Sequence, residues 1–385
     1  MYGMKTGNRL LALDVFRGIT VAGMILVNDP GFWSAVYAPL CHASWNGLTP
    51  TDLVFPFFMF IMGVSLYFSL RKYDSLFSEG ALIKVFRRAI LIFLVGLGIN
   101  WFSLWFGTFM SMGEGGFTFW ERFTQNIFPV ADIRILGVLQ RLAIAYLGGA
   151  ILCLAVRPRY YLLTALLILS GYFVLLSVGE GFARSEDNII SVVDRAVFGV
   201  KHLYGEWLPG GGRIAFDPEG LLSALPCFAH VLLGACMGRV LVEVKENEIR
   251  VRQLFVFGTM LLFAGYLLSY ACPVNKKIWS PTYVMITCGL ASQVLALLVY
   301  WIDVKGCKKG SRFFEAFGVN PLFMYVLSEI LAIILAYTFQ DQIYFVVLAS
   351  WLEPYFASLV YALLYVMLNW VIAYALYKRH IYIKI

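Results

Sequence analysis

Long, continuous apolar runs recur along the whole chain and are separated by short polar segments. Each run has about 20 residues, which is the length an α-helix needs to cross the hydrocarbon core of a bilayer. The runs are continuously apolar rather than alternating, a pattern that favours spanning helices over the strands of a membrane barrel. We predict about ten spans, at 10–28, 51–70, 84–105, 134–156, 159–178, 219–241, 251–271, 281–302, 318–338 and 355–377.

The composition agrees with this pattern. Apolar residues make up 61% of the chain and charged residues 14%, and a soluble core could not hide so much apolar surface. The expected fold class is therefore an all-α, polytopic integral membrane protein, organised as a single transmembrane domain over residues 1–385. The run at 341–352 is too short to cross and is predicted to be re-entrant or interfacial.

The charges are distributed unequally between the two sides of the predicted bundle. With the N-terminus inside, 20 of the 30 Lys and Arg residues fall in inner segments and 8 in outer ones. This asymmetry predicts that both termini are cytoplasmic, and it accounts for the net charge of +7 without a nucleic-acid partner. The cysteines show no metal-binding spacing, so no metal site is predicted. Two long outward-facing loops, at 106–133 and 179–218, are candidates for function.

Two ionisable residues lie inside the first predicted span. Asp14 and Arg17 are three residues apart, so they share a helical face. Charged groups at this depth are costly and usually face a cavity or a partner. They could form an intrahelical salt bridge, or Arg17 could receive an anionic ligand from the inner side.

The densest polar patch at a membrane edge lies between the first two spans. It contains His42, whose imidazole titrates near neutral pH and suits a general base. Asp52 heads the second span, where a helix N-terminus favours a carboxylate. A single histidine in a loop more often has no catalytic role, and Asp52 could simply cap its helix.

Several short motifs extend this patch and carry a resemblance. They are DVFRG at 14–18, HASWNGLT at 42–49, DLVFP at 52–56, RILGVLQRL at 134–142, FDPEG at 216–220 and GVNP at 318–321. In these motifs and in Asn28, the sequence resembles the heparan-α-glucosaminide N-acetyltransferase family. The lysosomal member of that family acetylates terminal glucosamine of heparan sulfate. The first block is long and specific, and the matching segments run from the first span to the ninth.

The resemblance implies a function and a site. It implies acetyl-CoA as the donor on the inside and an amino sugar or glycosaminoglycan fragment as the acceptor outside. It assigns the catalytic role to His42 and implicates Asn28, although the loop between them is longer here than in the lysosomal enzyme. It further implies a homodimer, embedded in lipid as a multi-pass protein of the bacterial cytoplasmic (inner) membrane.

Polar residues in or beside the spans are candidates for binding. Those predicted to bind acetyl-CoA are Arg17, Gln140, Arg141 and Asn320, with Asn100, Gln293 and Glu329 as further lining candidates. Those predicted to bind the acceptor are Trp45, Asn46, Asp52 and Glu219, with Trp120 and Trp207 as further stacking candidates. The alternatives are interhelical hydrogen bonds, interface anchoring and a helix-dipole acid at Glu219. His230 is interpreted as a packing residue.

Two chemical schemes and three functions stay open at this point. His42 could act as a general base for direct transfer, with Asn28 orienting it or stabilising the oxyanion, or it could carry a transient acetyl group. The leading function is an acetyl-CoA-dependent N-acetyltransferase. The alternatives are an O-acetyltransferase of a periplasmic or surface glycan and a small-molecule transporter, which no internal repeat supports.

Overall fold

The computed structural model describes residues 10–383, except 74–77, 126, 129 and 209. Nine helices in this part of the chain are long and apolar enough to cross a membrane, or ten if one bent pair counts as a span. The helices are α1 (Leu11–Asn28), α2 (Thr51–Leu70), α3 (Glu79–Ser111), α4 (Phe119–Thr124), α5 (Val138–Ala155), α6 (Tyr161–Val178), α7 (Ile189–Phe198), α8 (Leu225–Glu243), α9 (Asn247–Leu268), α10 (Pro281–Leu298), α11 (Ser311–Val319), α12 (Pro321–Ala336) and α13 (Pro354–Lys378). The predicted all-α polytopic membrane fold is confirmed.

Short elements connect these helices. They are the turns η1 (Ala38–Leu40), η2 (Arg71–Tyr73), η3 (Met112–Glu114), η4 (Pro158–Tyr160), η5 (Val200–His202) and η6 (Leu222–Ala224), the π-helical segments η7 (Val299–Val304) and η8 (Gln342–Leu348), and the strands β1 (Glu206–Trp207) and β2 (Arg213–Ile214). The strands form one antiparallel hairpin in which Glu206 pairs with Ile214.

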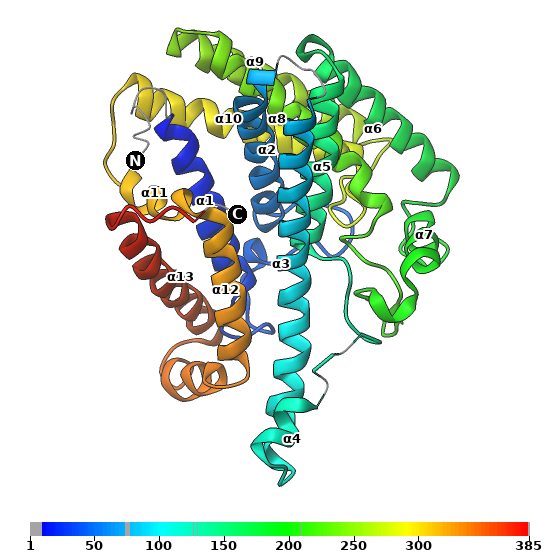
Figure 1. The fold of residues 1–385 in the computed structure, drawn as a ribbon, viewed down its shortest axis with the longest axis vertical. Helices are drawn as coiled ribbons and strands as arrows, with labels where there is room; N and C mark the ends of the chain where they lie inside the picture. The colour runs from blue at the N-terminus through cyan, green and yellow to red at the C-terminus, as the bar shows by residue number, and fades with distance from the viewer. Residues whose placement is uncertain (1–9, 74–77, 126, 129, 209, 384–385) are drawn as a thin grey trace.

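The ninth and third helices differ from the predicted spans. The ninth span is not continuous, because α11 and α12 meet at an angle of 85°. Pro321 has no N–H to donate and disfavours the helical conformation at Asn320, which breaks the helix there. The third helix is also longer than predicted and carries the first residues of the loop expected at 106–133. In Figure 1, α3 and α4 project beyond the rest of the bundle.

Glycines let two of the sequence motifs pack against each other. A Cβ atom at Gly18 would lie 1.7 Å from the carbonyl oxygen of Phe314, and one at Gly318 would lie 2.0 Å from that of Asp14. Small residues allow helix backbones to approach this closely, which is how membrane helices gain dispersion contacts. The DVFRG segment of α1 and the GVNP segment at the end of α11 therefore form one interface.

The connections 29–50, 112–137, 179–221 and 269–280 meet at one end of the bundle. The Trp45 indole donates to the carbonyl of Phe182 at 3.0 Å, and the Gly47 amide donates to the carbonyl of Val274 at 2.8 Å. In Figure 1, α4 lies at the bottom of the view, at this end. The charge asymmetry predicts that this end faces outward, and we refer to it as the loop end.

Candidate active site

His42 and Asp52 form a close pair at the loop end. The imidazole Nδ1 of His42 lies 2.7 Å from Oδ1 of Asp52. The Asp52 side chain is buried in the first turn of α2, whereas the His42 side chain is 47% exposed. A carboxylate that accepts the Nδ1 proton leaves Nε2 unprotonated, and this is how a general base is oriented.

The preceding loop wraps around the second oxygen of Asp52. The backbone amides of Ala43 and Thr49 donate to Oδ2 at 3.1 and 3.2 Å, and the Thr49 hydroxyl lies 3.0 Å away. The start of α2 adds the positive end of its helix dipole. The loop, the helix and the carboxylate therefore fix one another, and Oδ1 is left to face His42.

A proline in α2 fastens the same turn to the neighbouring helices. Pro56 has no N–H, so the carbonyl of Asp52 lacks its helical donor. The Tyr283 hydroxyl of α10 donates to that carbonyl at 2.6 Å. The carbonyl of Pro56 lies 2.9 Å from Nε2 of His230, which is buried on α8 beside Trp279. The structure thus places His230 in a packing position, as the sequence predicted.

A lysine that sequence reasoning missed completes the His42 centre. Nζ of Lys276 lies 3.1 Å from Nδ1 of His42 and 3.5 Å from Oδ1 of Asp52. Burial lowers the pKa of Lys276 below its ordinary value, although Asp52 and Glu219 oppose this effect. One feature of the sequence could have identified Lys276. It is one of two adjacent lysines in a connection predicted to face outward, where lysine is uncommon.

A second cluster of charged side chains joins the RILGVLQRL motif at 134–142 to the FDPEG motif at 216–220. Arg134 contacts Asp217 through Nε at 3.0 Å and Nη2 at 2.5 Å, and contacts Glu219 through Nη2 at 2.6 Å. Burial by itself would raise the pKa of Glu219. The positive charges of Arg134 and Arg141 have the larger combined effect and hold this pKa below its ordinary value. Lys276 also acts on Glu219, so this cluster adjoins the His42 centre.

The structure corrects the predicted setting of Glu219. The sequence placed it in the first turn of the sixth span, but α8 begins at Leu225 and Glu219 lies in the loop before it. Its carboxylate is therefore held by Arg134 rather than by a helix dipole. The hydrogen bond from the Glu219 amide to Oδ1 of Asp217, at 2.9 Å, stabilises this turn.

The other predicted acceptor residues lie near His42 or on the outer surface. Trp45 is half-buried and packs edge-on against Phe216, with 5.3 Å between ring centroids. Asn46 is exposed and accepts a hydrogen bond from the side chain of Asn275 at 3.1 Å. Trp120 and Trp207 are largely exposed. The segment 42–52 thus brings His42, Trp45, Asn46 and Asp52 into one region.

Asn28 lies in a different cavity. It lines a space of about 240 Å³ together with Asp29, Trp33 and Tyr365, and His42 is not among the lining residues. The Asn28 side chain also hydrogen-bonds Glu329 of α12. Asn28 is thus hydrogen-bonded to Glu329, whereas His42 is paired with Asp52.

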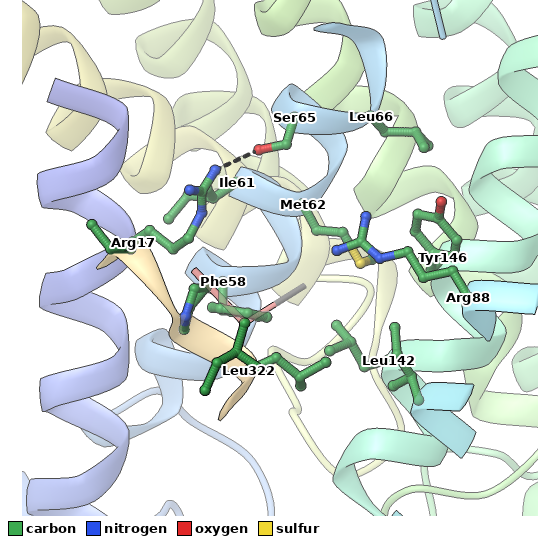
Figure 2. A pocket seen from close by; sticks show the side chains of 14 residues that line it. Arg17, Phe58, Ile61, Met62, Ser65, Leu66, Arg88, Leu142, Tyr146 and Leu322 are labelled. Atoms are coloured by element: carbon green, nitrogen blue, oxygen red, sulfur yellow. Dashed lines mark hydrogen bonds between the residues drawn. The ribbon is translucent and has the colours of Figure 1, made fainter. Parts of the chain in front are cut away.

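A larger cavity of about 430 Å³ carries two guanidinium groups. Figure 2 shows Arg17 and Arg88 approaching it from opposite sides, with Met62 and Phe58 between them. Arg17 also donates to Ser65 at 2.8 Å, and its guanidinium lies 3.1 Å from the Asp14 carboxylate. These contacts hold Arg17 in place, and a pair of guanidinium groups suits the binding of phosphate oxygens.

The predicted acetyl-CoA residues are distributed over three places. Arg17 lines the larger cavity, but Gln140, Arg141 and Asn320 are not among its lining residues. Arg141 is buried and hydrogen-bonds Ser223, with its guanidinium 4.9 Å from the Trp279 ring centroid. The Asn320 side chain donates to the carbonyl of Ile381 at 2.8 Å and so anchors the C-terminal segment at the helix break. Arg88 was not predicted as a site residue.

Helix α2 links the larger cavity to the His42 centre. Ser65, at its basic edge, is 13 residues after Asp52, which corresponds to about 20 Å along the helix axis. Phe58 also lines the cavity and is six residues after Asp52, or about 9 Å along the axis. The cavity therefore extends along α2 toward the loop end.

Comparison with known proteins identifies relatives of the chain. Residues 9–272 match the family described as "Heparan-alpha-glucosaminide N-acetyltransferase, catalytic". Heparan-alpha-glucosaminide N-acetyltransferase of Mus musculus is 27% identical over 99% of this chain and 61% of its own length. The protein of the same name from Homo sapiens is 29% identical over 84% of this chain and 53% of its own length. The chain thus spans between about half and three-fifths of these relatives. On the family match, which covers more than half of its residues, the chain belongs to the heparan-alpha-glucosaminide N-acetyltransferase catalytic family.

Proposed function

We propose that this protein is a transmembrane acetyltransferase. It takes an acetyl group from acetyl-CoA at the cavity lined by Arg17 and Arg88 and transfers it to the amino group of a glucosamine-type sugar at the loop end. The observation that carries this proposal is the His42–Asp52 pair, with Nδ1 and Oδ1 2.7 Å apart and the imidazole half-exposed. Family membership supports the reaction class.

The chemistry requires a base for the acceptor amine. The amine nitrogen attacks the thioester carbonyl carbon, the carbon–sulfur bond breaks, and Nε2 of His42 takes the proton that the nitrogen loses. The leaving CoA thiolate then accepts that proton from the imidazolium. Asp52 is buried, so its part in this step is to hold His42 and stabilise the transient imidazolium.

The proposed orientation divides the reaction across the bilayer. The charge asymmetry predicts that the loop end faces outside, and Ser65, which binds Arg17 at the edge of the larger cavity, lies about 20 Å from Asp52 along α2. Acetyl-CoA would enter from the cytoplasm and extend its thioester along α2 toward His42. A place in the bacterial cytoplasmic membrane and a homodimeric assembly are part of the same proposal.

Purified protein in detergent tests the reaction. Incubation with acetyl-CoA and glucosamine should release CoA thiol and form N-acetylglucosamine, and His42→Ala should abolish both products. His202→Ala is a matched control, since His202 is another loop-end histidine but hydrogen-bonds the Ile133 carbonyl at 2.8 Å. Formation of O-acetyl product would favour the glycan O-acetyltransferase. Release of CoA that is unchanged in His42→Ala would refute the assigned base.

Two further measurements define the mechanism. Incubation with acetyl-CoA alone, followed by mass spectrometry of the His42 peptide, separates the two schemes, because an acetylated His42 would refute direct transfer. Asn28→Ala tests whether this side chain, which lines a separate cavity, contributes to the same reaction. Direct involvement predicts a lower kcat, whereas wild-type kinetics would remove Asn28 from the mechanism.

A further inference from the structure

The connection between α9 and α10 is clamped onto the loop that carries His42. The Gly47 amide donates to the carbonyl of Val274, and the Asn275 side chain donates to Asn46 at 3.1 Å. Within the connection, Oδ1 of Asn275 accepts from the Ile278 amide at 3.1 Å, and the Ser280 hydroxyl accepts from the Asn275 amide at 3.0 Å. The position of Lys276, between these anchors, is therefore fixed relative to His42.

Lys276 and Asp52 compete for the same nitrogen of His42. Nδ1 lies 2.7 Å from Oδ1 of Asp52 and 3.1 Å from Nζ of Lys276. A single ring nitrogen either donates or accepts, so it cannot satisfy both neighbours in one tautomer. The shorter contact favours donation to Asp52, and the ammonium group then faces Oδ1, 3.5 Å away.

The charged groups around His42 and Lys276 determine whether protonation of His42 is favoured or opposed. His42 faces Asp52 from α2 and Lys276 from the α9–α10 connection. Lys276 in turn faces Asp52, Glu219 and Arg141. A buried carboxylate alone would favour an imidazolium at His42, which cannot act as a base. A positive charge close to the ring opposes that second proton.

We propose that Lys276 is a positioning residue that keeps His42 in its neutral, Nε2-accepting form by neutralising Asp52 and opposing protonation of the imidazole. The catalytic meaning of this inference rests on the proposed function, because a neutral His42 is needed only if His42 acts as a base. The effect of Lys276 on the protonation of His42 can be measured without any substrate.

Carbethoxylation by diethyl pyrocarbonate provides that measurement, since the reagent attacks the neutral imidazole. The rate of modification of the His42 peptide is followed by mass spectrometry across the pH range in wild type and Lys276→Met. Removal of the positive charge should move the midpoint of this profile up by about one pH unit or more. Lys276→Arg keeps the charge and should retain the wild-type midpoint.

Lys277→Met is the matched control. Lys277 is the next residue in the same connection and is about equally exposed, but it pairs with Glu206 at 2.5 Å rather than with His42. Its profile should coincide with that of wild type. Lys276→Gln provides the same test if Lys276→Met does not accumulate as a folded protein.

The result that overturns the inference is a Lys276→Met profile with an unchanged midpoint, whether the rates are equal to wild type or lower by a constant factor. In the transfer assay, the acid limb of kcat/KM should move in the same direction as the modification profile. Absence of acetyltransferase activity in the wild type would refute the proposed function alone, because the His42 profile reports on Lys276 independently.

Discussion

Replacement of Asp52 by Asn separates the charge of the carboxylate from its shape. Oδ2 of Asp52 accepts the amides of Ala43 and Thr49, so the amide oxygen of Asn would take that position. The NH₂ group would then face Nδ1 of His42, where Oδ1 now lies at 2.7 Å. A donor at this place forces Nδ1 to accept, which puts the imidazole proton on Nε2, and the base nitrogen is lost.

The expected magnitude follows from the contribution of a positioned base. General base catalysis contributes about 10² to 10⁴ in rate, which corresponds to about 3–5.5 kcal/mol in the activation barrier. The effect on the free energy of unfolding should be smaller. Asn keeps the hydrogen bonds from the loop amides, but these bonds become weaker because their acceptor is no longer charged, which costs about 1–2 kcal/mol. The activity should therefore fall far more than the stability.

The assay is CoA thiol release from acetyl-CoA with glucosamine, together with thermal unfolding of the same preparation. Asp52→Asn should lower kcat by at least about 100-fold while the unfolding midpoint changes little. The reasoning would be refuted by a variant that keeps more than about a tenth of the wild-type activity. A loss of activity matched by a loss of folded protein would instead assign Asp52 a structural role.

Three further outcomes are expected. Gly18→Ala should lower the thermal unfolding midpoint, because its Cβ would lie 1.7 Å from a backbone oxygen of Phe314, and overpacking of this kind costs about 1–3 kcal/mol. Burial, aided by Asp217, raises the pKa of Asp194 to about 6. Its ionisation therefore destabilises the fold as pH rises from about 4 to 6, and Asp194→Asn should stabilise by up to about 3 kcal/mol at pH 8 but not at pH 4. A membrane-impermeant maleimide should label exposed Cys41 on intact cells, and exposed Cys307 only after permeabilisation.

Each of these has a control and a contradicting result. Gly98→Ala adds a methyl group on α3 where no atom lies within 4 Å, so it should leave stability equal or higher. An unchanged midpoint in Gly18→Ala would refute the close-packed α1–α11 interface. Equal effects of Asp194→Asn at the two pH values would refute its raised pKa. Labelling of Cys307 but not Cys41 on intact cells would reverse the proposed orientation, and Cys41→Ser identifies the labelled site.

Most of the spans could be predicted because the bilayer imposes a simple rule on sequence. A helix that crosses lipid needs about 20 apolar residues and satisfies its own backbone, so its existence is a local property of the chain. The break at Asn320 was harder to predict, since membrane helices often contain proline without separating into two. The continuation of α3 to Ser111 was missed because its apolar run does not end at the expected membrane edge.

Some residues of the candidate site could likewise be predicted from the sequence, and others could not. His42 and Asp52 lie in one short segment, so both could be named as site candidates from the sequence. Their pairing was not predicted, because Asp52 was assigned to acceptor binding and only the folded loop shows its carboxylate facing His42. Lys276 could not be predicted, since 234 residues separate it from His42 and tertiary contacts of the α9–α10 connection with the His42 loop bring them together. Likewise, Arg134 and Asp217 belong to motifs whose pairing is invisible in the sequence.

The sequence by itself determined the class of the protein, its approximate spans, its family motifs and the identity of the candidate base. The class and the spans follow from hydropathy and charge, which depend on neighbours along the chain, whereas the candidate base follows from the resemblance of short local motifs to the family. The tertiary structure decided which charges share a site: Asp52 and Lys276 around His42, Arg134 with Glu219, and Arg17 with Arg88 in one cavity. Electrostatic interactions act through space over a few ångströms, so their partners are set by helix packing rather than by sequence separation.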